Sequence, residues 1–335
     1  MDKTVIFAVA GSGKSTYIVN SLSENKRSLI VTYTINNYEN LLKRITERFA
    51  GRWPENLTLM TFFQFLYRFC YKPFLSDIIG ARGIIYEINP NKFAKQNQHS
   101  YYLSDGRYFY SNRLAFFLEQ WGVVGEIKHR IQEYYDEFII DEIQDIAGRD
   151  FNFLEKLMST NVNMLFVGDF YQHTFDTSRD GNVNQSLFND RRAYEARFIR
   201  NGFTTNTTRL QNTWRCSKKI CDFISTNLGI NISSNKTDNC EEVLFVTDIA
   251  KKTAIINNPD IIKLHFKECY KYGPEHKNWG ETKGEDCYQN VCVMLNKETM
   301  KKYKTGKLSE LAPSTRNKLY VAITRAHGNV YLIEE

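Results

Sequence analysis

A stretch near the start of the chain, AVAGSGKST (residues 8–16), most strongly constrains the fold. It follows an apolar, β-leaning run (residues 4–9) and precedes a helical pattern (residues 14–22), with glycines between the two. The backbone N–H groups of such a loop and the start of the following helix form an anion-binding site. The stretch therefore predicts a nucleotide-binding α/β fold. The predicted nucleotide contacts are Ala10, Gly11, Ser12, Gly13, Lys14, Ser15 and Thr16.

Two residues of this loop carry most of its expected chemistry. The ammonium group of Lys14 would reach the β- and γ-phosphates, and the hydroxyl of Ser15 would bind Mg²⁺. The general phosphate-loop pattern, G-x-x-x-x-G-K-[ST], has a glycine at the position that Ala8 occupies here. At this point a damaged nucleotide site, a chance match and the variant of one particular class of protein all stay open.

Apolar runs that alternate with helical patterns predict the rest of the first half. Further strands are expected at residues 29–32, 57–60, 138–140 and 163–167, with helices at 36–49 and 151–158 among others. This alternation is typical of a parallel, doubly wound sheet that binds its ligand at the carboxyl ends of the strands. We expect an N-terminal lobe at 1–176 with a small insertion at about 70–135, a linker at 177–206, and a C-terminal lobe at 207–335. The second lobe's expected strands are 243–246, 290–294 and 330–333.

Composition excludes several classes of protein and permits a polyanionic partner. The chain has 335 residues, a formal net charge of +6 and an odd number of cysteines, seven, without C-x-x-C pairing. Reduced thiols and the absence of a secretory signal or a membrane-length apolar run predict a cytoplasmic protein without a membrane partner. The histidines and cysteines do not show zinc-ligand spacing.

Two strand ends carry polar residues that suit nucleotide hydrolysis. In FIIDEIQD (residues 138–145), Asp141 would hold the Mg²⁺ that Ser15 also binds, and Glu142 would polarise the attacking water. In FVGDFYQHTF (residues 166–175), Gln172 would hydrogen-bond the γ-phosphate or the water. The alternative for each is a solvated side chain at the end of a strand. A phosphate loop at a sensible distance favours the catalytic interpretation of the acidic pair.

Taken in order, these segments resemble the motifs of the UvrD/Rep-like superfamily 1 DNA helicases. Their phosphate loop reads A-x-x-G-x-G-K-T, so Ala8 resembles the family's own variant. A single motif is a weak signal, whereas a fixed order across nearly the whole chain is a strong one. The other matching segments are VTYT (31–34), TFFQF (61–65), DEIQD (141–145), GDFYQ (168–172), LQNTWRCS (210–217), KGED (283–286) and LYVAITRA (319–326).

The resemblance implies two RecA-like P-loop NTPase lobes with parallel sheets and an ATP site in the cleft between them. ATP and Mg²⁺ would be the cofactors, and Arg215 and Arg325 would act as cis arginine fingers on the γ-phosphate. Gly284 and Asp286, in the K-G-x-E-like segment, would contact the nucleotide. ATP hydrolysis would drive movement along single-stranded DNA in the 3′ to 5′ direction. The residues that would contact DNA are Thr32, Tyr33, Thr34, Phe62, Phe63 and Phe175.

The sequence also departs from the family pattern, and these departures leave alternatives open. The stretch before Ala8 is too short for the family's adenine-reading glutamine motif, and too few residues separate Arg215 from Lys283 for the large second-lobe insertion. The histidine of the T-F-H segment is Phe63 here. One alternative is an ATPase that DNA or a protein partner activates within a repair or anti-phage defence complex, without unwinding. A P-loop kinase of a small metabolite is a third class, and RNA as the track is not excluded by physics.

Overall fold

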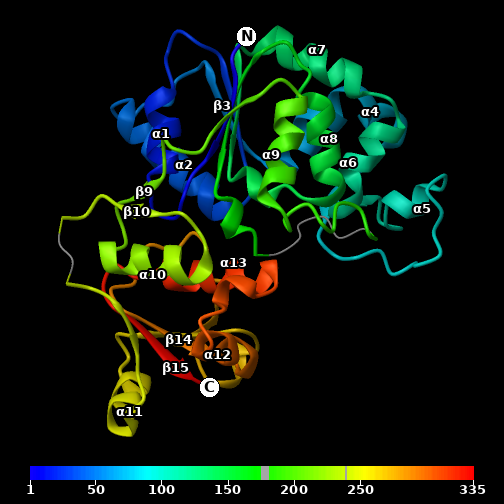
Figure 1. Ribbon diagram of the computed structural model, residues 1–335. Helices are drawn as coiled ribbons and strands as arrows, with labels where there is room; N and C mark the ends of the chain where they lie inside the picture. Colours follow the sequence, from blue (N-terminus) through cyan, green and yellow to red (C-terminus); the bar gives the residue numbers. More distant parts are fainter. Residues whose placement is uncertain (175–180, 238–239) are drawn as a thin grey trace. The chain divides into compact units, whose positions relative to one another are not determined.

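The computed structural model describes residues 1–174, 181–237 and 240–335 (Figure 1). Its contacts divide the chain into two compact units, which are described separately. The N-terminal unit consists of Met1–Ile6, Ser15–Gly168 and residues 181–206. The C-terminal unit consists of Phe7–Lys14, residues 169–174 and the described chain from Thr207 onward. The phosphate loop and the segment that carries Gln172 therefore group with the C-terminal unit, although the sequence predicts both in the first lobe.

A six-stranded sheet forms the centre of the N-terminal unit, and its strand pairs of defined register run parallel. Two of its inner strands, Ser28–Thr32 and Glu137–Asp141, are largely buried and mostly apolar, as expected for a parallel sheet that is covered on both faces. In Figure 1, α1 (Lys14–Ser21) and α2 (Ile35–Arg48) lie on one side of this sheet, and α8 (Gly148–Leu157) and α9 (Arg191–Arg200) lie on the other. The strand order is β3 (Leu57–Thr61), β2 (Ser28–Thr32), β6 (Glu137–Asp141), β7 (Asn163–Gly168), β1 (Lys3–Phe7) and β8 (Thr204–Asn206).

The helices of this unit begin at the positions that their capping residues set. Thr34 accepts a hydrogen bond from the backbone N–H of Asn37 and so caps α2, whose Leu41 and Ile45 are buried. Thr61 and Gln64 form a reciprocal capping box at α3. The helices are α1 (Lys14–Ser21), α2 (Ile35–Arg48), α3 (Phe62–Gln64), the π-helix η1 (Phe65–Tyr71), α4 (Lys72–Ile79), α5 (His99–Tyr102), α6 (Ser111–Gln120), α7 (Val124–Tyr134), the 3₁₀-helix η2 (Ile143–Asp145), α8 (Gly148–Leu157) and α9 (Arg191–Arg200).

The predicted insertion at about 70–135 is only in part a separate element. Strands β4 (Gly83–Ile85) and β5 (Tyr108–Tyr110) form a small sheet of their own. Helix α6, by contrast, buries Leu114 to Leu118 and packs against α8. The second half of the predicted insertion therefore belongs to the core of the unit. Its aromatic and asparagine content makes the sequence look irregular although the backbone is helical.

The prediction of a linker at 177–206 is wrong for residues 181–206, the part of this segment that the structure describes. Helix α9 and strand β8 lie within it, and β8 pairs in parallel with β1 through Thr4 and Thr204. Tyr194 and Phe198 of α9 are fully buried, and the ring of Phe198 lies 5.8 Å from that of Phe151. Charged and polar residues surround these two aromatic residues in the sequence and obscure their helical spacing.

A five-stranded parallel sheet forms the C-terminal unit, and helices α10 and α13 pack on each other beside it. The predicted strands at 243–246, 290–294 and 330–333 are confirmed. The strand order is β11 (Val243–Phe245), β15 (Val330–Glu334), β14 (Val291–Leu295), β12 (Ile262–His265) and β13 (His276–Asn278). The other elements are the pair β9 (Asn212–Thr213) and β10 (Ser233–Ser234), the helices α10 (Lys218–Leu228), α11 (Ile249–Asn257), α12 (Lys297–Lys304) and α13 (Pro313–Ile323), and the 3₁₀-helices η3 (Phe170–Gln172), η4 (Cys269–Lys271) and η5 (Leu308–Glu310).

Within the described ranges, none of the helices combines the length and the apolar character needed to cross a lipid bilayer.

Candidate functional site

The phosphate loop joins the end of β1 to the start of α1 and has the backbone that its glycines permit. Gly11 and Gly13 have φ angles of +69° and +87°, in the left-handed region that glycine tolerates best. Lys14, the first residue of α1, is 9% exposed. The hydroxyl of Ser12 is buried and has no hydrogen-bond partner among the residues that the structure describes. A buried polar atom of this kind normally has a partner, so the loop is suited to a ligand with oxygen atoms such as a phosphate.

Neighbouring backbone holds the loop closely within the C-terminal unit. The N–H of Val9 donates to the carbonyl of Leu210 at 3.0 Å, and the N–H of Trp214 donates to the carbonyl of Gly11 at 2.9 Å. A Cβ atom added to Gly11 would lie 2.6 Å from Oγ1 of Thr213 and 2.8 Å from Cβ of Arg215. Glycine is therefore favoured at position 11 for two reasons, the left-handed backbone and the close approach of Thr213 and Arg215.

Replacing Gly11 with alanine should lower the free energy of unfolding by at least about 2 kcal/mol, because it combines a left-handed alanine with a steric clash. Gly51→Ala is the matched control: Gly51 has a φ of +83°, but a Cβ there would meet nothing within 4 Å. Thermal unfolding of both variants separates the clash from the backbone cost. Equal shifts in the two midpoints would contradict the close approach at Gly11.

The acidic pair at the end of β6 has two distinct environments. Asp141 is the last residue of the strand and is 2% exposed. Glu142 has a φ of +55°, and its carboxylate accepts a hydrogen bond from the side-chain amide of Gln144. A non-glycine residue in the left-handed region costs on the order of 1–3 kcal/mol and often marks a functional site. The backbone thus directs the two acids differently, as expected if one binds a metal and the other a water.

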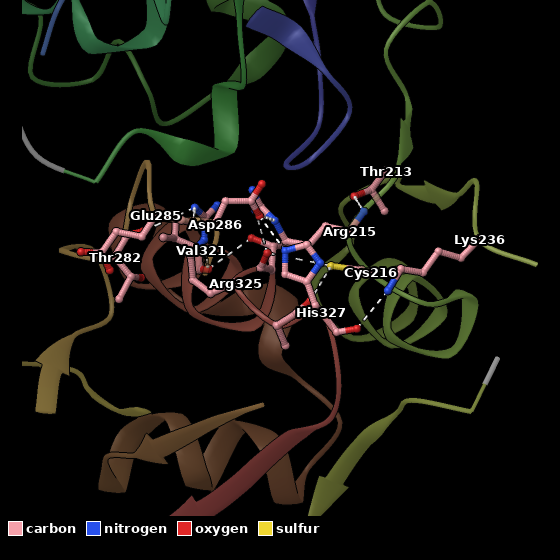
Figure 2. Close-up of polar contacts among 12 residues, drawn as sticks. Thr213, Arg215, Cys216, Lys236, Thr282, Glu285, Asp286, Val321, Arg325 and His327 are labelled. Atoms are coloured by element: carbon pink, nitrogen blue, oxygen red, sulfur yellow. Dashed lines mark hydrogen bonds and ion pairs between the residues drawn. The ribbon is translucent and has the colours of Figure 1, made fainter. Parts of the chain in front are cut away.

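A cluster of polar contacts positions Arg215 within the C-terminal unit (Figure 2). Its Nε donates to Oδ1 of Asp286 at 2.6 Å, and its Nη1 donates to the carbonyl of Thr324 at 2.9 Å. His327 Nε2 lies 2.8 Å from the same Asp286 oxygen. Burial acts to raise the pKa of Asp286, but the charge of Arg215 and its hydrogen bonds outweigh it and lower that pKa overall. In this structure Asp286 forms an ion pair with Arg215. The contact between Asp286 and the nucleotide stays a prediction.

Arg325 is buried in the same cluster (Figure 2). Its Nη1 donates to the carbonyls of Glu285 at 3.0 Å and Thr282 at 3.3 Å, and its Nε donates to that of Val321 at 3.2 Å. Burial, and then the charge of Arg215, lowers the pKa of Arg325 to about 10. The carbonyls of Thr282 and Glu285 lie on either side of Gly284 in the chain, and Gly284 has a φ of +85°. The structure therefore brings the last motif and the K-G-x-E-like segment together, while the predicted finger role of Arg325 stays a prediction.

Three of the six side chains predicted to contact DNA are buried. Thr32 and Phe62 are 1% exposed, and Phe63 is 9% exposed, so they are core residues of the N-terminal unit. Thr34 has its hydroxyl engaged as the cap of α2. Tyr33 is half-buried and stacks on Phe62 with 5.9 Å between ring centroids. Burial in the core corrects the prediction of direct base contacts for Thr32, Phe62 and Phe63. Phe175 lies outside the described residues.

The structure also identifies residues that the sequence analysis missed. Tyr86 is 71% exposed, and its ring contacts that of Phe63 edge to face at 5.2 Å. Trp214 is exposed beside the phosphate loop to which its N–H is bonded. Asp169 and Tyr320 are fully buried and hydrogen-bonded to each other. Trp214, Asp169 and Tyr320 all lie inside motifs named above, so membership of a motif is the signal by which the sequence could have indicated them.

Comparison with known proteins identifies the family of the chain. Residues 118–334 match the sequence profile described as the viral superfamily 1 RNA helicase core domain. The chain belongs to this family, because the match covers more than half of its length. No curated protein sequence matches the chain. Membership of superfamily 1 is therefore confirmed, and the UvrD/Rep-like branch stays a prediction.

The fold of this chain is similar to that of viral helicases of known structure. The PRRSV helicase matches with a TM-score of 0.50 and 12% identity, over 99% of this chain and 52% of that protein. The arterivirus nonstructural protein 10 helicase in complex with DNA has a TM-score of 0.49 and 14% identity, over 99% of this chain and 60% of that protein. The chain thus spans only about half to three fifths of these proteins. The match to the PRRSV helicase supports the predicted α/β fold with parallel sheets. At 12% identity it shows the fold alone.

Proposed function

We propose that this chain is a superfamily 1 helicase or translocase that hydrolyses ATP with Mg²⁺ and moves along single-stranded nucleic acid. The observation that carries the proposal is the phosphate loop. It combines two left-handed glycines, a largely buried lysine and a buried serine hydroxyl that has no hydrogen-bond partner in the described part of the chain. In a chain of the superfamily 1 helicase core family, such a loop is expected to bind a nucleoside triphosphate.

The roles that we propose for the polar residues follow from their chemistry. Lys14 holds the β- and γ-phosphates, and Ser15 and Asp141 hold Mg²⁺, which neutralises charge on the phosphates when bound. Glu142 orients and deprotonates the attacking water, with Gln172 as a sensor of the γ-phosphate. Arg215 and Arg325 supply positive charge toward the γ-phosphate. The ordered contacts of both arginines with backbone carbonyls and Asp286 support a fixed rather than a mobile placement.

Single-stranded DNA is the track that we propose, with 3′ to 5′ movement, because the motifs resemble those of UvrD/Rep-like helicases. The family profile is named for RNA helicases, so RNA is the direct competitor. One observation favours a second candidate function, an ATPase that a protein partner or DNA activates without unwinding. Phe62 and Phe63, two aromatic residues of the predicted DNA motifs, are buried, so neither offers a free face on which a base could stack.

The test is the rate of ATP hydrolysis by the purified chain, alone and with single-stranded DNA or RNA, with Lys14→Ala as the inactive background. Strong stimulation by DNA supports a DNA motor, and strand-separation assays on tailed duplexes then give polarity. Preferential stimulation by RNA would reassign the track. A rate that depends on Lys14 but ignores both nucleic acids would support activation by a protein partner.

Tyr86 provides a specific test of nucleic-acid binding. Because its exposed ring continues the aromatic cluster of Tyr33, Phe62 and Phe63, Tyr86→Ala should weaken the affinity for single-stranded DNA about tenfold, which is the contribution of one stacked base. The affinity is measured by fluorescence anisotropy of a labelled oligonucleotide. Tyr270→Ala, which removes another exposed tyrosine, is the control and should bind normally. Unchanged binding by Tyr86→Ala would exclude Tyr86 from the track.

A further inference from the structure

We infer that Tyr320 is a positioning residue. Its hydroxyl bonds both to the phosphate loop and to the Gln172 segment (residues 169–174), and so fixes the position of one relative to the other. Its kinetic consequence rests on the proposed function, whereas its structural consequence does not. Tyr320 lies on α13 and is fully buried. Its hydroxyl oxygen is 2.9 Å from the backbone nitrogen of Ala10 and 3.0 Å from Oδ2 of Asp169.

The chemistry of the two partners fixes the direction of both hydrogen bonds. A backbone N–H can only donate, and the hydroxyl of Tyr320 directs its hydrogen at a carboxylate oxygen of Asp169. The hydroxyl of Tyr320 therefore accepts from Ala10 in the phosphate loop and donates to Asp169. Both partners are fully buried, so neither has water as a substitute. A phenylalanine at this position would leave a buried donor, the N–H of Ala10, and a buried acceptor, Oδ2 of Asp169, each short of one hydrogen bond.

Asp169 extends this connection to the residue that we propose as the γ-phosphate sensor. Its other oxygen, Oδ1, accepts from the N–H of Tyr171 at 3.1 Å and so caps η3, the short helix that ends with Gln172. The side-chain amide of Asn317, one turn before Tyr320 on α13, donates to the carbonyl of His173 at 3.2 Å. The Gln172 segment is thus bonded to α13 at both ends.

Other hydrogen bonds also hold the phosphate loop. Loss of the Tyr320 hydroxyl should therefore shift the position of the loop relative to the Gln172 segment without unfolding the loop. Val9 and Gly11 keep their backbone bonds to Leu210 and Trp214. Tyr320→Phe should therefore still bind ATP, with a KM within about threefold of the wild type. The turnover number should fall about tenfold or more, because Gln172 is no longer held at a fixed place relative to the loop.

The matched control is Tyr71→Phe in the N-terminal unit. Tyr71 is also fully buried, and its hydroxyl also accepts from a backbone N–H at 2.9 Å, that of Ala81. This variant loses the same kind of bond at a place that the proposed chemistry does not use. A loss of turnover through general destabilisation would appear equally in both variants.

The experiment combines hydrogen exchange with ATPase kinetics on the full chain. In Tyr320→Phe, amide exchange in peptides covering residues 7–14 and 167–174 should accelerate at least about tenfold, and in Tyr71→Phe it should not. Asp169→Asn should resemble Tyr320→Phe, and the double variant should have no more than the larger single effect on turnover. Unchanged exchange at these peptides, unchanged turnover, or multiplied effects in the double variant would each overturn the inference. If the wild type hydrolyses no ATP, the proposed function fails, and hydrogen exchange still decides whether Tyr320 holds the two segments together.

Discussion

Lys14→Ala is expected to reduce kcat/KM for ATP by more than about 1,000-fold, and to weaken the binding of a fluorescent ATP analogue as well. The ammonium group lies at the start of α1, after a loop whose backbone favours anions. Its removal takes away the one full positive charge in that loop. A phosphate would then be held by backbone dipoles and hydroxyl groups only, and the charge that develops during hydrolysis would not be neutralised.

The control for this variant is Lys297→Ala. Lys297 is also the first residue of a helix, α12, but it is exposed and lies outside every proposed motif. It should hydrolyse ATP at the wild-type rate. Both variants should unfold at nearly the wild-type temperature. Retention of ATP hydrolysis in Lys14→Ala would show that the activity belongs to another site or to a contaminant.

Glu142→Gln is expected to reduce the turnover number by about 10²–10⁴-fold with little change in nucleotide affinity. The substitution keeps the size of the side chain and an oxygen that can accept from Gln144, so the local hydrogen bond can persist. It removes the negative charge and the basicity needed to take a proton from water. Single-turnover kinetics with bound ATP separate this loss of chemistry from a loss of binding.

Glu268→Gln gives a matched control for Glu142→Gln. Glu268 also has a left-handed backbone, with a φ of +58°, and it pairs at the surface with Lys271. Any effect of placing glutamine in the left-handed region would appear in both variants, whereas a loss of catalysis would appear only in Glu142→Gln. Turnover within a few-fold of the wild type in Glu142→Gln would assign the general base to another residue.

Local features of the phosphate loop and the acidic pair could be predicted because they depend on neighbouring residues. A strand, two glycines and a helix start produce the loop wherever the surrounding chain lies. An apolar run that ends in Asp141 and Glu142 places acids at a strand's carboxyl end, and β6 confirms it. The order of the motifs also indicated superfamily 1, which the family match confirms. These predictions needed no knowledge of which residues pack against each other.

Burial and long-range partners could not be predicted in the same way. Phe62 and Phe63 look like base-stacking residues in a motif, yet packing against Tyr33 makes them core residues. Helix α9 lies in a segment whose sequence predicts a linker, because charged residues surround its two buried aromatic residues.

The contacts of Asp286 with Arg215, and of Tyr320 with Ala10, join residues that are 71 and 310 positions apart in the chain. Hydrophobic periodicity and turn residues act over a few positions, so the sequence specifies the strands, the loop and the order of the motifs. Which polar groups meet depends on how distant segments pack, since a hydrogen bond forms only where burial brings a donor to an acceptor and excludes water. Folding therefore determines which motif residues are free to bind a ligand and which hold another residue in place.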